Sequence, residues 1–438
     1  MPNGCSHLSR KIGPQHPLAG KTVYIPIMAE GSSEAFSAVF RWLGVDASPT
    51  PPSNERTREL GAKHCNGDEC YPAKVTVGDF IRVLEQPEVD PKRTMFFMPT
   101  AEGPCRFGQY APFLAKTLRE IGHSDVQILS PTSQNSYDGL GEISTPFMRA
   151  GWRALVAADV LRKALQRTRP YELVPGSADK VYQESLADLC AAIENSCSDN
   201  DCQLKAMVAS MKRARDGFRQ VPADYDPNVP LIGVVGEIFC RLNTFSNEDL
   251  IRKLEGYGAE SWLSDISEWV QYTNAEHLRK LKLVGRYWTL DMLKAQLRGH
   301  IQGSDEHALL EPFKDDFVGY QEPEVQELFQ CAQPYLPNHG VFGEMVLSVG
   351  KAVYLAKHGA DGIIDISPFT CMNGIVSEAV YPKVSKDFGG IPIRNFYFDG
   401  TQADLDRDLG IYMELTRSYR EKKAFRRKYP HYFRPPAA

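Results

Sequence analysis

The stretch TMFFMPTAEGPCRFGQY, from Thr94 to Tyr110, contains the pattern that decides the fold. Its first seven residues are mostly apolar, which predicts a buried strand over residues 94–100. Cys105 follows a Gly-Pro pair and stands at the predicted start of a helix. A buried strand followed by a turn and a helix is the repeating unit of a parallel α/β sheet.

The same unit recurs before and after this stretch. An amphipathic helix that ends at a glycine is predicted over residues 29–44, directly after an apolar segment. Further strands are predicted at residues 21–28, 125–131, 230–239, around Glu260, 362–369 and 393–400. This alternation predicts an α/β protein with parallel sheets and helices on both faces of each sheet.

Two segments interrupt the alternation with helical periodicity, which divides the chain into parts of different character. We predict a tail (1–20), a first α/β domain (21–160), a helical region (161–228), a second α/β domain (229–400) with a helical insertion at about 269–335, and a C-terminal helical tail (401–438). The two α/β domains are expected to share one design.

The composition of the chain argues against some classes of function and partner. The chain has 438 residues and a formal net charge of -5, with no long basic run, so we expect no nucleic-acid partner. No apolar run approaches the roughly 18 residues that span a bilayer, and the first residues lack the apolar core of a signal peptide. We therefore expect a cytoplasmic protein without a membrane partner, whose ten cysteines are reduced thiols.

Three cysteines share one setting. Cys105 and Cys371 each follow a predicted strand and precede a helix, and Cys70 precedes a proline and a helix. The carboxyl ends of parallel strands are where ligands gather, and helix N-termini favour a thiolate over a thiol. Three such thiolates could hold a metal or an iron–sulfur cluster. The alternative is that each cysteine is a small buried apolar residue.

The other cysteines are weaker candidates. Cys65 could form a zinc or redox site with His64 and Cys70, and Cys240 is expected to end a strand near the sheet edge as an extra ligand. Cys190 and Cys197 are expected to pack on one helix face, and CSDNDC is expected to be an exposed loop. Cys5 and Cys331 are interpreted as structural or surface thiols.

Five motifs taken together resemble the 2-hydroxyacyl-CoA dehydratase component family, and in particular its activase-related branch. They cover roughly residues 20 to 400 and are NGDECYPAK, MPTAEGPCRFGQY, VVGEIFCRLNTFSNEDLIRKLE, GEMVLSVGKAV and ISPFTCMNGIVSEAV. The second and the last are the most specific. The chain departs from the family pattern at Cys65 and Cys240, where other residues are usual.

The resemblance implies Rossmann-like domains around an oxygen-sensitive iron–sulfur cluster, with Cys70, Cys105 and Cys371 as ligands. It also implies a separate ATP-hydrolysing activase, with its own iron–sulfur cluster, that supplies low-potential electrons, because no GxxxxGK[ST] motif occurs in this chain. The expected activity is reduction or dehydration of a small substrate such as an acyl-CoA. We expect one [4Fe–4S] cubane, with an [8Fe–9S] double cubane of a small-molecule reductase as the alternative.

Other polar residues and other functions complete the expectations. Arg106 could balance cluster charge or hold an anionic substrate, and Glu237 could act as an acid or base or as a helix cap. Lys351, on the helix that follows Glu344, is expected to be solvated.

The rival functions are a non-catalytic electron relay or cluster-assembly scaffold, and a zinc-stabilised interaction protein. A homo- or heterodimer is expected.

Overall fold

The computed structural model describes residues 12–101, 103–132, 138–197, 199–337, 343–401 and 404–434. Two four-stranded parallel sheets organise these residues, in the strand orders β2-β1-β3-β4 and β6-β5-β7-β8. Both orders place the first strand of the sheet beside the second and the third, so the two sheets have the same topology. The predicted α/β class and the shared design of the two halves are confirmed.

The strands are short and all parallel. They are β1 (Thr22–Ile25), β2 (Asp46–Pro49), β3 (Thr94–Phe97), β4 (Gln127–Leu129), β5 (Leu231–Gly236), β6 (Glu260–Leu263), β7 (Gly362–Pro368) and β8 (Ile393–Phe398). Three of the four central strands, β3, β5 and β7, are wholly buried, whereas alternate residues of the fourth, β1, are only partly buried.

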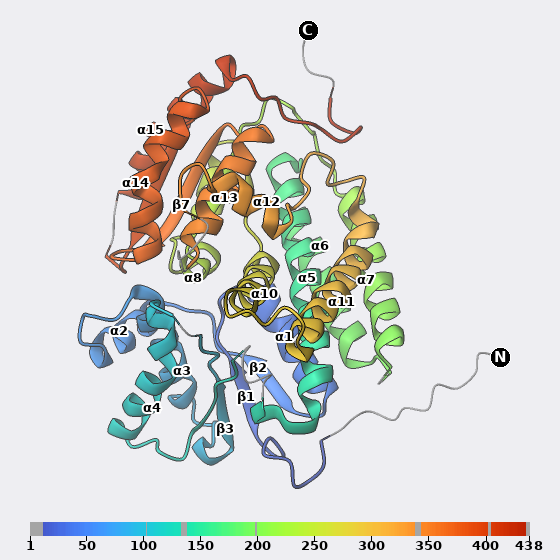
Figure 1. Cartoon of the computed structure of the whole chain (residues 1–438), viewed down its shortest axis with the longest axis vertical. Coiled ribbons are helices and arrows are strands. Elements are labelled where there is room, and N and C mark those ends of the chain that lie inside the picture. The colour runs from blue at the N-terminus through green and yellow to red at the C-terminus, as the bar shows by residue number, and fades with distance from the viewer. Residues whose placement is uncertain are drawn as a thin grey trace, which may run out of the picture.

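Helices cover both faces of each sheet (Figure 1). The α-helices are α1 (Glu30–Trp42), α2 (Glu55–His64), α3 (Tyr71–Leu84), α4 (Tyr110–Glu120), α5 (Ser144–Thr168), α6 (Ser177–Glu194), α7 (Asn200–Gln220), α8 (Ile238–Leu242), α9 (Leu250–Gly256), α10 (Ile266–Leu283), α11 (Leu290–Leu310), α12 (Val325–Ala332), α13 (Met345–Lys357), α14 (Met372–Asp387) and α15 (Leu405–Lys422). Short 3-10 helices include η2 (Arg106–Gln109).

Alternation along the strands explains the layers. Met95 and Phe97 of β3 face the largest apolar cluster, whereas Phe96 between them faces a second cluster with α3 and α4. In β5, Val235 belongs to the largest cluster and Val234 to a third one, which includes α15. Since the largest cluster takes side chains from both sheets and from α5, α6 and α7, it joins the two halves into one core.

Two boundaries differ from the sequence expectations. The predicted limit between residues 160 and 161 falls inside α5. The strand predicted over 230–239 ends at Gly236, so Cys240 does not end a strand but lies in α8, a correction. Gly236 has φ of 115°, and an added Cβ there would clash with Ile366, which explains the abrupt end of the strand.

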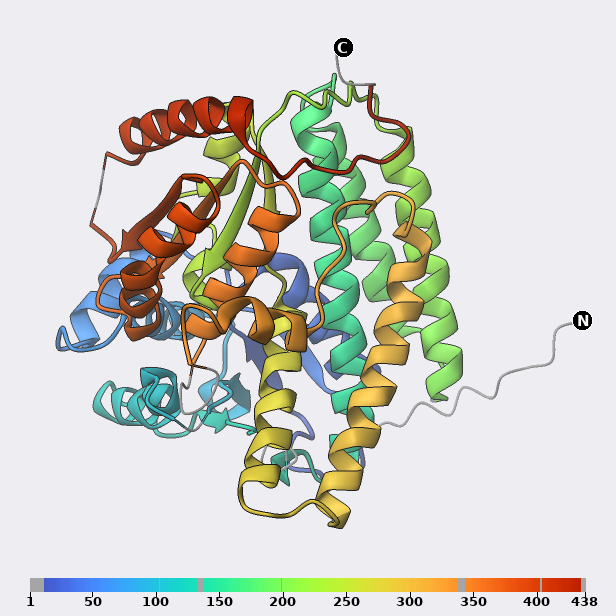
Figure 2. The ribbon, with the colours of Figure 1, turned by 45° about the horizontal axis from the view of Figure 1, so that its top comes forward.

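The helical insertion contains an antiparallel hairpin of α10 and α11, drawn in yellow, which projects from the body of the molecule (Figure 2). Its tip exposes several large apolar side chains, and Trp288 is wholly exposed. No helix in the described part of the chain is long and apolar enough to cross a membrane.

Candidate functional site

The structure places all three candidate cysteines directly before helices. Cys70 precedes α3, Cys105 precedes η2 and Cys371 precedes α14, each with extended backbone dihedral angles. Cys105 and Cys371 also follow the carboxyl ends of β3 and β7. The two sheets therefore direct these turns to positions where parallel α/β folds commonly bind ligands.

The three thiols share one electrostatic environment. A charge on Cys70 raises the pKa of Cys105, and charges on Cys70 and Cys371 both raise the pKa of Cys240. Glu237 acts on all of them, since its carboxylate raises the pKa of Cys70, Cys105 and Cys371. Residues from both halves of the chain therefore converge on one place.

Desolvation has a larger effect on the pKa of these thiols than the helix N-termini have. Burial raises the pKa of Cys105 to about 11 and that of Cys371 to about 12. The backbone N–H groups of Asn373 and Gly374 lower the pKa of Cys371, but by less, and its thiol makes no capping hydrogen bond. Burial therefore opposes the thiolate form that we expect at these turns, and a bound metal would have to displace the protons.

Tyr110 is a member of the site that the sequence did not indicate. Its hydroxyl lies 2.7 Å from Sγ of Cys70 in a hydrogen bond. Burial raises its pKa, and charges on Cys70, Glu237 and Cys105 raise it further. The phenol stands at the start of α4, one turn after Cys105. The quoted motif GPCRFGQY contains it, but nothing in the motif distinguishes a ring that contacts a thiol from one that fills the core.

Glu237 forms the cap of a helix. Its carboxylate accepts hydrogen bonds from the backbone N–H groups of Phe239 (3.1 Å) and Cys240 (2.8 Å), at the start of α8. Its own N–H donates to the carbonyl of Ile366 in β7. Burial raises its pKa. The capping interpretation therefore holds, and a carboxylate fixed in this way lies beside the thiols.

Arg106 is exposed and lies between the two halves of the site. Its Nη1 is 3.5 Å from Oγ1 of Thr370, the residue before Cys371, and its charge lowers the pKa of Cys70. A mobile guanidinium in this position can meet a negative charge at the site, whether that charge belongs to thiolates or to a bound anion.

The two possible extra ligands differ in burial. Cys65 follows the last residue of α2 and is half-buried, and desolvation raises its pKa to about 12. Cys240 is completely buried, and its pKa is raised well above the ordinary value, first by burial and then by Glu237. Charge on Cys70 acts on both, so both lie near the site.

The remaining cysteines include a disulfide. Cys197 and Cys202 are joined, which corrects the expectation that all cysteines are reduced. Cys197 also lies beyond the end of α6, so it shares no helix face with Cys190, another correction. Cys190 and Cys331 pack against the largest apolar cluster, and Cys5 lies outside the described residues.

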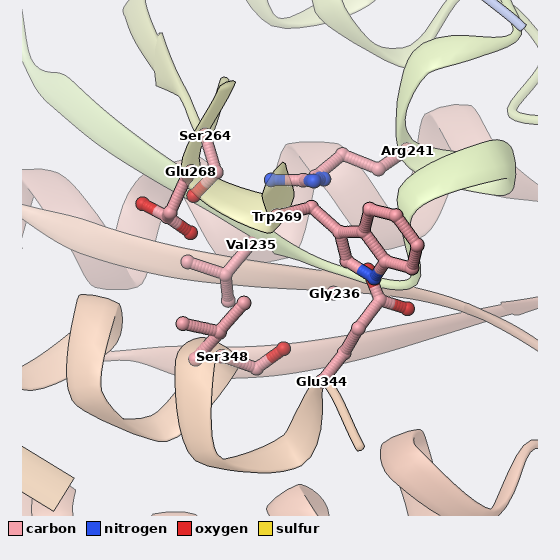
Figure 3. Close-up of a pocket in the computed structure, with 9 residues that line it drawn as sticks. Val235, Gly236, Arg241, Ser264, Glu268, Trp269, Glu344 and Ser348 are labelled. Carbon is pink, nitrogen blue, oxygen red and sulfur yellow. The ribbon is translucent and has the colours of Figure 1, made fainter. Parts of the chain in front are cut away.

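A small cavity adjoins the site at the carboxyl end of β5 (Figure 3). Its volume is about 10 Å³. The polar side chains that line it are Arg241, Ser264, Glu268, Glu344 and Ser348. Glu344 also acts on the thiols, because its charge raises the pKa of Cys105 and Cys371.

Lys351 is a correction among the charged residues. The side chain expected to be solvated is wholly buried. Its Nζ donates to Glu268 (2.8 Å) and also pairs with Glu322, which in turn pairs with Lys163. The signal that the sequence did offer is the apolar helix around it, GEMVLSVGKAV, which has little polar surface.

The side chains at the site can be compared with the ligands that an iron–sulfur cluster needs. The described residues contain no group of three or more His, Cys, Asp or Glu side chains that could hold a metal ion. Cys70 and Cys105 are instead separated by a longer distance, at which a charge on Cys70 still raises the pKa of Cys105. A polynuclear cluster takes its thiolates at different irons, so its ligands surround it and do not meet at one point. Three thiols from three turns are ligands of the kind that such a cluster takes.

A comparison with known protein families finds no family model that matches this chain. A search of curated proteins finds no similar sequence.

Proposed function

We propose that this chain is an iron–sulfur protein that receives low-potential electrons from an ATP-dependent activase, with its own cluster, and uses them for reduction or dehydration of a small substrate, such as an acyl-CoA. The observation that supports the proposal is the convergence of Cys70, Cys105 and Cys371 at three helix starts, with shared electrostatics. The resemblance of the motifs to the dehydratase component family supports the same function.

Cys70, Cys105 and Cys371 would hold the cluster, which supplies low-potential electrons and an iron that can polarise a substrate oxygen. The surrounding residues have separate roles. Tyr110 holds the Cys70 side chain through its hydroxyl, and Glu237 fixes α8 against the site. Arg106 can orient an anionic substrate at the exposed edge beside Cys105.

The first test is iron and sulfide content after purification without oxygen. The wild-type protein should be brown, and Cys105→Ala or Cys371→Ala should lose most of its iron. Cys190→Ala and Cys331→Ala are matched controls, because these cysteines pack in the core away from the site. Full iron retention in both site variants would falsify the assignment of these ligands.

The number of irons tests the nuclearity. We propose one cubane with about four irons per chain, held without Cys65 and Cys240. Cys65→Ser and Cys240→Ser should then leave the iron content unchanged. About eight irons, with a loss in either variant, would instead assign a double cubane and additional ligands.

The activase and the catalytic role are tested by turnover. The chain alone should not hydrolyse ATP, and substrate turnover should require the activase, ATP and a reductant together. If the cluster is reduced under these conditions but no candidate substrate turns over, the electron-relay function replaces the catalytic one.

A further inference from the structure

A buried arginine with an unsatisfied Nε lines the cavity at the end of β5. Arg241 is 4 % exposed, and its Nε has no hydrogen-bond partner among the described residues. Ser264, which is 1 % exposed, has an equally unsatisfied Oγ. In Figure 3 the Arg241 guanidinium extends into the space between Ser264, Trp269 and Glu344. Buried donors of this kind are costly unless a ligand or water satisfies them.

The size of the cavity selects the occupant. A volume of about 10 Å³ is close to that needed for one water molecule and too small for a substrate. A buried water needs two to four polar partners, and Arg241, Ser264, Glu268 and Glu344 all line the space. The cavity also adjoins the turn after β5, whose neighbours in the sheet are β6 on one side and β7 on the other. Open α/β sheets bind ligands beside such turns.

The two carboxylates connect the cavity to different parts of the molecule. Glu268 belongs to the buried network with Lys351 and Glu322, and the side chain of Glu322 is 16 % exposed. Glu344 faces the other way, because it acts on Cys105 and Cys371 and accepts from the N–H of Ile238. A water between these carboxylates would join the network to the cysteine site.

We propose that one water occupies this cavity and, with Glu268 and Glu344 on its two sides, forms an internal proton route to the cysteine site. The inference rests on the proposed function, because reduction of a substrate consumes protons together with the electrons that the activase supplies. Arg241 and Ser264 are positioning residues that hold the water.

Each proton movement balances. The Glu344 carboxyl gives its proton to the bound substrate as the O–H bond breaks, and the electron pair of that bond stays on the carboxylate. The water then gives a proton to Glu344 and receives one through Glu268, whose carboxylate first accepts that proton from the ammonium of Lys351. Solvent restores the proton of Lys351 through Glu322.

The surroundings of Glu344 favour its protonated form. Burial is the largest of the effects that raise the pKa of Glu344 to about 8, and the charge of Glu237, beside β5, is the second largest. Asp365 of β7 raises it further, whereas Arg241 of α8 and the N–H of Ile238 lower it. At neutral pH the carboxyl therefore holds the proton that the route delivers.

The test begins with a crystal structure of the full chain at a resolution that shows ordered water. One water is expected within hydrogen-bond distance of Nε of Arg241 and Oγ of Ser264. An empty cavity, or one filled by a side chain, overturns the proposal. This measurement needs no iron, so its failure and the failure of the proposed function are distinguishable.

The route itself is tested by infrared spectroscopy. Among the carbonyl stretches of buried protonated carboxyls, the wild-type protein should show one band that is absent from Glu344→Gln. Ser264→Val and Ser264→Thr have the same shape, but only threonine keeps the hydroxyl. In deuterated buffer the band should shift about tenfold more slowly in the valine variant than in the threonine variant. Equal rates in the two variants, or no such band in the wild type, would show that no water-borne route reaches Glu344.

Discussion

At the scale of single residues, charge burial is the least conventional feature of this protein. Lys351 has no exposed surface, and Glu268 and Glu322 raise its pKa against the effect of burial. The same pairing lowers the pKa of Glu322. Such pairs contribute little net stability when intact, but the loss of one partner leaves buried charge without compensation.

Lys351→Ala should therefore destabilise the protein by about 3–5 kcal/mol, because Glu268 loses its cation and Glu322 keeps only Lys163. Lys357→Ala is the matched control, since Lys357 is exposed on the same helix and should change stability by no more than about 0.5 kcal/mol. Urea denaturation of both variants measures the free energies of unfolding. Similar small losses in both would contradict the described ion pairs.

At the scale of helices and strands, the sequence predicted the elements that carry strong periodicity. It found β1, β3, β5 and β7 because their apolar runs are continuous, and it located the helices that begin after Cys105 and Cys371. It missed β2, whose sequence DASP has no strand-forming residue, and α2, whose face is mostly polar. Backbone pairing with β1, a tertiary effect, makes DASP a strand.

The sequence could not assemble the site for a related reason. The positions of Cys70, Cys105 and Cys371 before helices follow from local patterns, but the contact of Tyr110 with Cys70 depends on how α3 and α4 pack. Burial of Lys351 and the cavity at Arg241 likewise depend on elements far apart in the chain. Helical periodicity in the sequence shows which face of a helix is apolar. It does not show which charged groups of other elements meet that helix.

The pair α2 and α3 offers a test at this scale. The helices approach so closely at Gly78 that an added Cβ would clash with the backbone carbonyl of Thr57. Gly78→Ala should separate them, destabilise the protein by about 1–3 kcal/mol and reduce iron retention through Cys70. Gly256→Ala, which meets open space in α9, should be neutral or slightly stabilising. Thermal unfolding and iron content of the two variants provide the comparison.

At the scale of the whole molecule, stability should depend on pH through several buried acids. Burial raises the pKa of Asp79 to about 6 and that of Glu306 to about 7. An acid whose pKa is higher in the folded state binds a proton on folding. Its contribution is therefore complete below the unfolded pKa and is lost as the pH rises through the folded value.

Glu306→Gln should consequently flatten the decline in unfolding free energy between about pH 5 and pH 7, with an effect of up to about 3 kcal/mol. Glu276→Gln, in the same hairpin, is the control, because that carboxylate is paired with Arg279. Denaturation curves across this pH range test the prediction, and a slope that is the same in wild type and Glu306→Gln would refute it.

The division of the cysteines between the two sheets has a mechanical consequence. Cys70 and Cys105 belong to the first α/β half, and Cys371 belongs to the second. A cofactor bound by all three would link the two halves a second time, in addition to the apolar core that they share. Loss of the cofactor would then weaken the contact between the halves.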